Sequence, residues 1–310
     1  MKPITMSKLW RGSATLSKVY SKKYLKNARI AYLFLIPSML GLIIFRIFPI
    51  VYSFIGSLFS VSYTRGGGLV FTGLQNYLDL FQDPLFWHSL KITLIFNLFV
   101  NPIQIVIALI LAVLLNGTNL STRIIRTLFL LPLGVSVVIA STIWGILLNP
   151  HEGLINSVLK TLGLPMQPFL TSPNQALWCI ILIASWCGIP YWMIFLLAGL
   201  QNIPSEYYES AKIDGANCWQ VFWYITLPLL RRPLVFVLVA DTSANFLLFA
   251  PIFVLTRGGP QWSTNLLMYE AYTSAFIYSD FPRALTITSI LLLMLLVVVL
   301  VEIKLLQKEE

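Results

Sequence analysis

Asp241 and Asn245 are the polar residues of this chain whose types and spacing best suit recognition of a polar solute. They lie four residues apart in the apolar stretch 233–255, so a helix would place both side chains on one face. A carboxylate accepts hydrogen bonds, an amide donates and accepts them, and aromatic rings cover the apolar face of a hydroxyl-rich molecule. The candidate residues of a solute path are Asp241, Asn245, Phe246 and Phe249.

The same pair also has a purely structural interpretation. An ionised carboxylate at membrane depth costs ~2.5–3.5 kcal/mol on insertion scales, so Asp241 needs a cavity or a partner. A hydrogen bond to another helix or a pair with a basic group would satisfy it. Arg46 in the first apolar stretch is a candidate, although its place nearer the outer surface also suits snorkelling. The sequence leaves both interpretations open.

The common motifs of enzymes are absent. The chain has no glycine-rich phosphate loop ending in Lys-Ser/Thr, no His-Glu-x-x-His and no Gly-x-Ser-x-Gly. Its only histidines are His88 and His151, and Asp241 is the only acid inside an apolar stretch apart from Glu302 at the end of one. We therefore expect no enzymatic activity, and no metal or cofactor bound by this chain.

The elements that position these residues must be membrane helices. The chain is 57% hydrophobic and 11% charged, with a mean hydropathy of +0.80, so most of its surface must face lipid or apolar partners. A helix of about 20 apolar residues crosses the ~30 Å hydrocarbon core. The predicted fold class is an all-α polytopic membrane protein with about six transmembrane helices, at 31–58, 88–115, 124–148, 176–200, 233–255 and 284–306.

The distribution of basic residues predicts the orientation. Fifteen lysines and arginines fall in residues 1–30, in the second and fourth breaks between spans, and in the tail, whereas the opposite breaks hold three. The positive-inside rule places both termini in the cytoplasm. The net charge of +9 thus reflects membrane topology rather than nucleic-acid binding. We expect a basic cytoplasmic segment at 1–30, a membrane domain at 31–306 with a cytoplasmic loop at 201–232, and a cytoplasmic tail at 307–310.

The loop at 201–232 is the longest polar break and has helix-turn-helix punctuation. Pro204 favours a helix start, and Gly215 supplies a backbone conformation that other residues avoid. Asn217 and Gln220, three apart, predict a capping box for a second helix, which we expect Pro228 to end. Such a loop suits a protein partner, although an amphipathic loop resting on lipid headgroups would share the helical pattern.

The complete spacing, Glu-x-Ala-x3-Gly-x9-Ile-x-Leu-Pro, resembles the EAA signature of binding-protein-dependent ABC importers. The chain is similar to permease subunits that take up carbohydrates such as maltose and other oligosaccharides, or glycerol-3-phosphate. The resemblance covers nearly all of the chain after residue 30 and includes segments 71–77, 148–156 and 255–260. Ser210 replaces the middle alanine of the signature, and Lys91 stands where the family often has asparagine, so a substrate contact cannot be transferred to that position.

The resemblance implies a set of partners in a bacterial or archaeal cytoplasmic membrane. These are a second, homologous permease, two copies of a cytoplasmic ATPase that use ATP and Mg, and an external solute-binding protein, all within membrane lipid. The implied ATPase-coupling residues are Glu206, Glu209, Ser210, Ala211, Asp214, Gly215, Ala216, Ile225, Leu227 and Pro228. The alternatives are a non-ABC secondary carrier or channel for a small polar solute, and a membrane receptor or scaffold.

Overall fold

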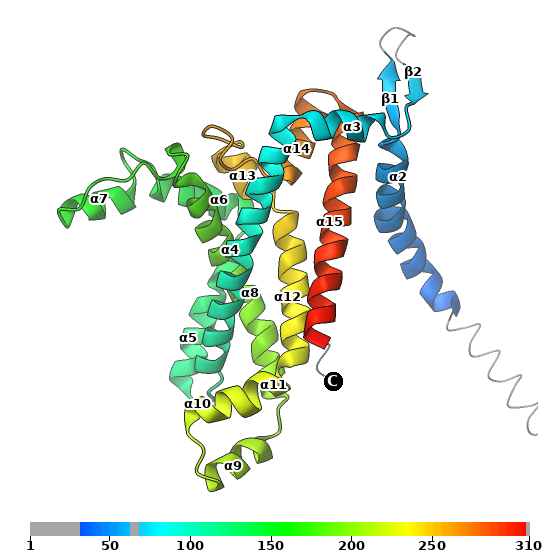
Figure 1. Cartoon of the computed structure of the whole chain (residues 1–310). Coiled ribbons are helices and arrows are strands. Elements are labelled where there is room, and N and C mark those ends of the chain that lie inside the picture. Colours follow the sequence, from blue (N-terminus) through cyan, green and yellow to red (C-terminus); the bar gives the residue numbers. More distant parts are fainter. Residues whose placement is uncertain (1–31, 63–67, 308–310) are drawn as a thin grey trace, which may run out of the picture. The chain divides into compact units, whose positions relative to one another are not determined.

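The computed structural model describes residues 32–62 and 68–307 (Figure 1), so the expected N-terminal segment and most of the tail lie outside the described residues. The chain forms two compact units, Met1–Ile55 and Gly56–Glu310. In the first, a helix begins at Tyr32, contains a π-helical segment at Ile43–Ile47 and continues into α2 (Phe48–Gly56). It is long and apolar enough to span a membrane, which confirms the first expected span.

The second unit is a bundle of long helices. Four candidate spans cover α4 (Pro84–Leu114), α8 (Ala176–Gln201), α12 (Arg231–Phe246) with the following α13 (Ala250–Leu255), and α15 (Phe281–Gln307). With the first helix, the described residues contain five helices able to cross a membrane, or six if one bent pair counts as a span. The chain is therefore a multi-pass helical membrane protein, as its hydropathy predicts.

The bent pair occupies the position of the third expected span. α5 (Leu120–Leu130) and α6 (Val137–Leu147) meet at 99° across a 3-10 turn at Leu131–Gly134 and an extended Val135. Pro132 lies in that turn and has no N–H to continue the helix. The span expected at 124–148 therefore forms as two helices that are separated at Pro132.

The segment between the first two spans begins with a β-hairpin. A short antiparallel hairpin pairs β1 (Phe59–Ser62) with β2 (Gly68–Phe71), and α3 (Gln75–Gln82) follows. Phe71 belongs to β2 and Gly73 has a φ of +60°, so the helix begins only at Gln75. Asn76 Nδ2 donates to the carbonyls of Ser57 and Phe59, which fixes α3 against the hairpin.

The core of the bundle lies mainly between α4 and α8. Ala108 and Ala112 of α4 are fully buried with Met193 and Leu196 of α8. The small alanines let the two helices approach closely. α12 and α15 complete the bundle, and α14 (Leu267–Tyr272) covers one end of it. α7 (Leu154–Thr161) extends from the bundle near α6 (Figure 1).

The opposite end of the bundle carries the loop predicted at 201–232 (Figure 1). It consists of α9 (Ser205–Ile213), α10 (Cys218–Val221), a π-helical segment at Phe222–Thr226 and α11 (Leu227–Leu229). We call this the loop end, and the end with β1, β2, α3 and α14 the hairpin end.

Candidate functional site

The turn of the helix-turn-helix loop is built by Gly215. Its φ is +79°, in the left-handed region that glycine adopts without strain. The N–H of Ala216 donates to the carbonyl of Ala211 at 2.9 Å, and the N–H of Gly215 donates to that of Lys212 at 3.1 Å. This pair of bonds is the Schellman pattern that closes a helix C-terminus. The glycine of the signature is thus required by backbone geometry.

The second helix of the loop starts at the predicted capping box. Asn217 Oδ1 accepts from the N–H of Gln220, and Gln220 Oε1 accepts from the N–H of Asn217, both at 2.9 Å. These bonds satisfy two backbone donors that a helix N-terminus otherwise leaves unpaired. Together with the Schellman turn, they fix the angle between α9 and α10 through local contacts.

Pro228 does not end this helix. α10 continues through the π-helical segment into α11, where Pro228 lies in the first turn. The continuous helix runs only one residue past Pro228, to Leu229. The chain turns one residue after α11, at Leu230, and α12 begins at Arg231. The loop therefore leads almost directly into the fifth span.

Some of the residues predicted to couple this loop to a partner are buried or half-buried, and the others are exposed. Ala211 is buried, and Tyr208 Oη lies 3.4 Å from Thr226 Oγ1. Ala216, Ile225 and Leu227 are half-buried. The exposed ones are Glu206, Glu209, Ser210, Asp214, Gly215 and Pro228. The loop thus presents its acidic residues and its turn outward while small and aliphatic residues hold it together.

A notch of about 310 Å³ lies beside the turn, lined by residues that include Asp214, Gln220 and Tyr224. Tyr224 in its wall is 79% accessible, and Ile213, which precedes Asp214 in the chain, is 86% accessible. Exposed apolar groups next to polar ones are typical of a protein-interaction surface. The loop thus combines exposed acidic residues with exposed apolar side chains beside its turn.

The second candidate site is a polar network inside the bundle. Asn245 Nδ2 donates to Asp241 Oδ1 at 2.9 Å and to Asn101 Oδ1 of α4 at 2.8 Å. Asn101 Nδ2 donates to Thr242 Oγ1 at 3.1 Å, and Thr242 Oγ1 donates to Glu302 Oε1 of α15 at 2.8 Å. Five side chains therefore join α4, α12 and α15 at membrane depth.

The network is buried and incompletely satisfied. Asp241 is 1% and Asn245 4% exposed, while Asp241 Oδ2 and Glu302 Oε2 have no hydrogen-bond partner among the described residues. An unpaired acceptor away from water costs about 1–3 kcal/mol. Such a set retains acceptor capacity for an additional donor.

The aromatic candidates lie in two separate apolar clusters. Phe246 is fully buried with Phe86 and Ile287. Phe249 stacks on Phe253 with ring centroids 5.2 Å apart and lies 4.8 Å from Tyr272. The structure thus brings Asp241 and Asn245 together with polar neighbours, while each phenylalanine packs with other rings or aliphatic residues.

Several network residues were not predicted from the sequence. Asn101 belongs to a series of polar residues at every fourth position of α4, which also contains Ser89, Thr93 and Asn97, all buried. Four-residue spacing puts them on one helix face. This spacing is the feature of the sequence that could have predicted a buried polar face on α4. Lys91 lies on the same helix but is exposed.

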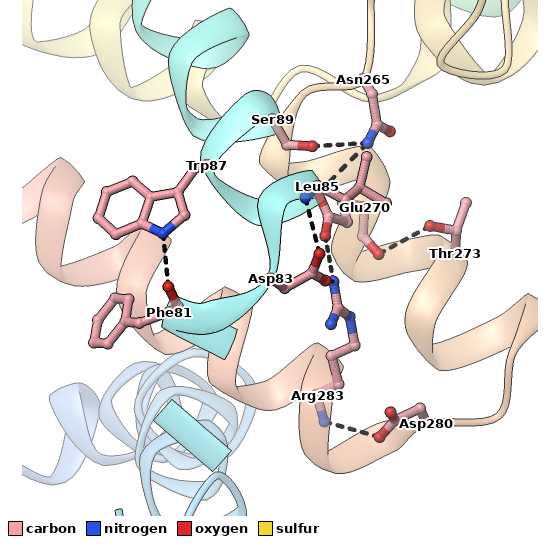
Figure 2. A network of polar contacts seen from close by, with 10 residues as sticks. All are labelled: Phe81, Asp83, Leu85, Trp87, Ser89, Asn265, Glu270, Thr273, Asp280 and Arg283. Atoms are coloured by element: carbon pink, nitrogen blue, oxygen red, sulfur yellow. Dashed lines mark hydrogen bonds and ion pairs between the residues drawn. The ribbon is translucent and has the colours of Figure 1, made fainter. Parts of the chain in front are cut away.

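A third polar cluster closes the hairpin end (Figure 2). The Arg283 guanidinium of α15 contacts Asp83 Oδ2 at 2.5 Å and Glu270 Oε1 of α14 at 2.7 Å. Asn265 Nδ2 donates to Ser89 Oγ of α4 at 2.8 Å. One cation thus fixes the start of α4, α14 and the start of α15 to one another.

Residues 104–305 match the family model for the inner membrane component of binding-protein-dependent transport systems. The chain belongs to this family. It is a permease subunit of an ABC importer, not an enzyme, and the EAA signature of the loop is typical of such subunits.

Individual sugar-transport permeases align with this chain over most of their length. The chain is 34% identical to the lactose transport system permease protein LacF of Rhizobium radiobacter over 290 residues, covering 92% of this chain and 95% of LacF. It is 32% identical to the trehalose/maltose transport system permease protein MalF of Thermococcus litoralis over 256 residues, covering 81% of this chain and 85% of MalF.

The fold also matches a solved transporter. A chain of a bacterial ABC transporter involved in the import of the acidic polysaccharide alginate superposes with a TM-score of 0.78, at 24% identity, covering 94% of this chain and 99% of that one. This likeness confirms the helical permease architecture.

Proposed function

We propose that this permease forms half of the membrane path for a carbohydrate of oligosaccharide size, in an importer powered by separate ATPase subunits. The observation that carries the proposal is the exposed loop of α9 and α10, which presents acidic and apolar side chains on its surface. The second half of the path is a homologous permease, and an external binding protein delivers the solute.

Carbohydrate is the solute class that agrees with both the relatives and the residues. LacF and MalF carry names of disaccharide transport systems, and the structural relative imports a polysaccharide. The polar network around Asp241 and Asn245 offers amides and carboxylates, which suit sugar hydroxyls. In this proposal Asp241 and Asn245 contribute to the solute path, with Phe246 and Phe249 as neighbouring apolar elements.

The loop at 201–232 couples the path to the ATPase. Two ATPase copies bind ATP and Mg on the cytoplasmic side, and their movement reaches α12 through the docked loop. The turn at Leu230 supports this route, because α11 ends only one residue before α12 begins. A displacement of the loop would therefore act directly on the helix that bears Asp241.

The proposed orientation follows from the charges. The loop end faces the cytoplasm together with both termini, since the basic residues gather on that side of the spans. The hairpin end then faces the external binding protein. Lipid surrounds the apolar sides of the spans.

Charge reversal of Glu209 tests the proposal. Glu209 is exposed near the turn, so Glu209→Lys should leave membrane insertion unchanged and lower solute-stimulated ATP hydrolysis and uptake at least several-fold. Glu152→Lys, an equal charge change at an exposed site near α7, is the matched control. Normal uptake by an assembled complex that carries Glu209→Lys would contradict coupling through this surface.

A further inference from the structure

A pocket of about 260 Å³ lies between the loop and the ends of two spans. Val113 and Asn116 come from the end of α4 and the residues after it, and Leu200 comes from the last turn of α8. The opposite wall belongs to α9 and to the helix that begins at Cys218. Because α4 and α8 are spans that end here, the pocket lies at the membrane boundary of the loop end.

The hydrogen-bond donors of this pocket suit an anion. Lys212 is the only charged residue among the described residues that line it. The Lys212 ammonium and the Asn116 side-chain amide form no ion pair or hydrogen bond with any other described residue. The Tyr208 hydroxyl, also in the wall, has a long contact of 3.4 Å with Thr226 Oγ1. An ammonium, an amide and a hydroxyl can all donate to phosphate oxygens.

The acidic residues of the loop lie outside this pocket. Asp214 lines the separate notch beside the turn. Glu206 and Glu209 are exposed and belong to the lining of neither cavity. The carboxylates of α9 therefore do not occupy the position that an anion would take beside Lys212.

The rest of the pocket wall is mainly apolar, which favours a lipid over a soluble anion. Val113, Leu200, Val221 and Phe222 line it. The glycerol end of the acyl chains would bury apolar surface against these side chains, which is favourable, whereas inorganic phosphate has no apolar surface to bury. The volume is below the ~300–1,000 Å³ of sites that enclose drug-sized ligands. It therefore suits a headgroup whose acyl chains extend into the membrane.

Exposed tryptophans beside the pocket also indicate lipid. Trp219 and Trp223 are 71% and 51% exposed. Trp219 stacks on Phe222 of the pocket wall, with 6.2 Å between the ring centroids. Tryptophan is enriched where a membrane meets water, because its ring is apolar and its N–H is polar. The same helix leads through α11 to the start of the fifth span at Arg231, so these rings lie at headgroup level.

We propose that this pocket binds the headgroup of an anionic phospholipid. Lys212, Tyr208 and Asn116 donate to its phosphate, and the apolar wall contacts the glycerol end of its acyl chains. Basic residues gather on this side of the spans, which attracts anionic lipids to the same surface. A lipid bound here connects α9 with the ends of α4 and α8, and so holds the loop against the bundle. Its binding needs neither a solute nor an ATPase.

The reactivity of Cys218 tests the site, because this thiol is exposed and lines the pocket. Cys179→Ala and Cys187→Ala make it the only thiol of the chain. The full chain in neutral detergent is treated with N-ethylmaleimide after addition of phosphatidylglycerol, or of phosphatidylcholine with the same acyl chains. Phosphatidylglycerol should slow the modification of Cys218 several-fold, and phosphatidylcholine, which has no net charge, should change it little. Equal rates with the two lipids would overturn the proposal.

Two substitutions of Lys212 test the proposed contact with the phosphate. Lys212→Gln should abolish the protection of Cys218, whereas Lys212→Arg keeps the positive charge and should retain it. Full protection in the Lys212→Gln variant would contradict the assignment of Lys212.

Two further measurements distinguish lipid in the pocket from other causes of protection. Ser210→Cys, combined with Cys218→Ser, places the thiol at an exposed site of α9 outside the pocket. Its rate should not depend on the lipid, and equal slowing at both positions would reveal a general effect of the charged micelle surface and overturn the site. Glycerol phosphate at the same concentration should protect Cys218 little. Equal protection by this soluble anion would overturn the assignment to lipid.

Discussion

Asn245 of the fifth span donates a hydrogen bond to Asn101 of the second span, with 2.8 Å between Nδ2 and Oδ1. The same amide also donates to Asp241. Both bonds come from one NH₂ group, so its two hydrogens are fully used in this state. A solute that needs Asn245 as a donor would have to displace one of these contacts, and Asp241 itself is buried, at 1% exposure.

Asp241→Asn and Asn245→Ala separate solute binding from structural pairing. If these side chains line the path, each change should shift the apparent affinity for the solute several-fold while the ATPase still binds. A structural role alone predicts low yield of the complex, with an unchanged apparent affinity in whatever assembles. Uptake kinetics measured beside complex yield distinguish these outcomes, and normal values for both would exclude the pair from the path.

Gly215 offers a sharp test of the loop geometry. A Cβ at this position would meet nothing within 4 Å in this chain, so the intramolecular effect of a substitution arises from the φ of +79°. Gly215→Val should destabilise the turn by about 1–2 kcal/mol or more, because β-branched residues avoid the left-handed region. We expect it to lower solute-stimulated ATP hydrolysis with normal insertion.

Gly215→Asn is the matched control, since asparagine tolerates left-handed backbone better than most residues. It should retain most of the activity. Equal loss in both variants would mean that the surface at Gly215, rather than its backbone conformation, is what matters.

Cysteine accessibility tests the orientation. With the loop end inside, Lys212→Cys should resist a membrane-impermeant thiol reagent in sealed cells, while Lys160→Cys and Arg257→Cys should react. The test is made in a background without the native cysteines, because Cys218 is exposed on the loop. External labelling at position 212 would reverse the topology and remove the basis for coupling through the loop.

Arg283→Gln should be destabilising. Glu270 is 2% exposed and forms its ion pair with Arg283, whose side chain is 27% exposed, so leaving this buried carboxylate without its partner should cost about 1–3 kcal/mol. Lys160→Gln, at an exposed site on α7, should change the free energy of unfolding by no more than about 0.5 kcal/mol. Thermal unfolding of the purified complex in detergent compares them, and equal midpoints would contradict the role assigned to Arg283.

The loop was predictable because its structure is encoded locally. Gly215, Asn217 and Gln220 form the turn and cap with partners a few residues away, so contiguous sequence specifies them. The polar network depends on how separate helices pack, and hydropathy does not reveal that Asn101 and Glu302 approach Thr242. Likewise, Pro132 marks a break in the third span but does not set its 99° angle, which depends on the packing of α5 and α6.

The Schellman turn and capping box have a further consequence for recognition. Their bonds satisfy backbone donors and acceptors at the turn from within the loop itself. The loop therefore has its turn and cap formed before it binds a partner protein. Association then avoids most of the conformational entropy loss that a flexible segment would incur. Docking of this surface should therefore behave as a rigid-body encounter, with affinity set by complementarity rather than by folding on contact.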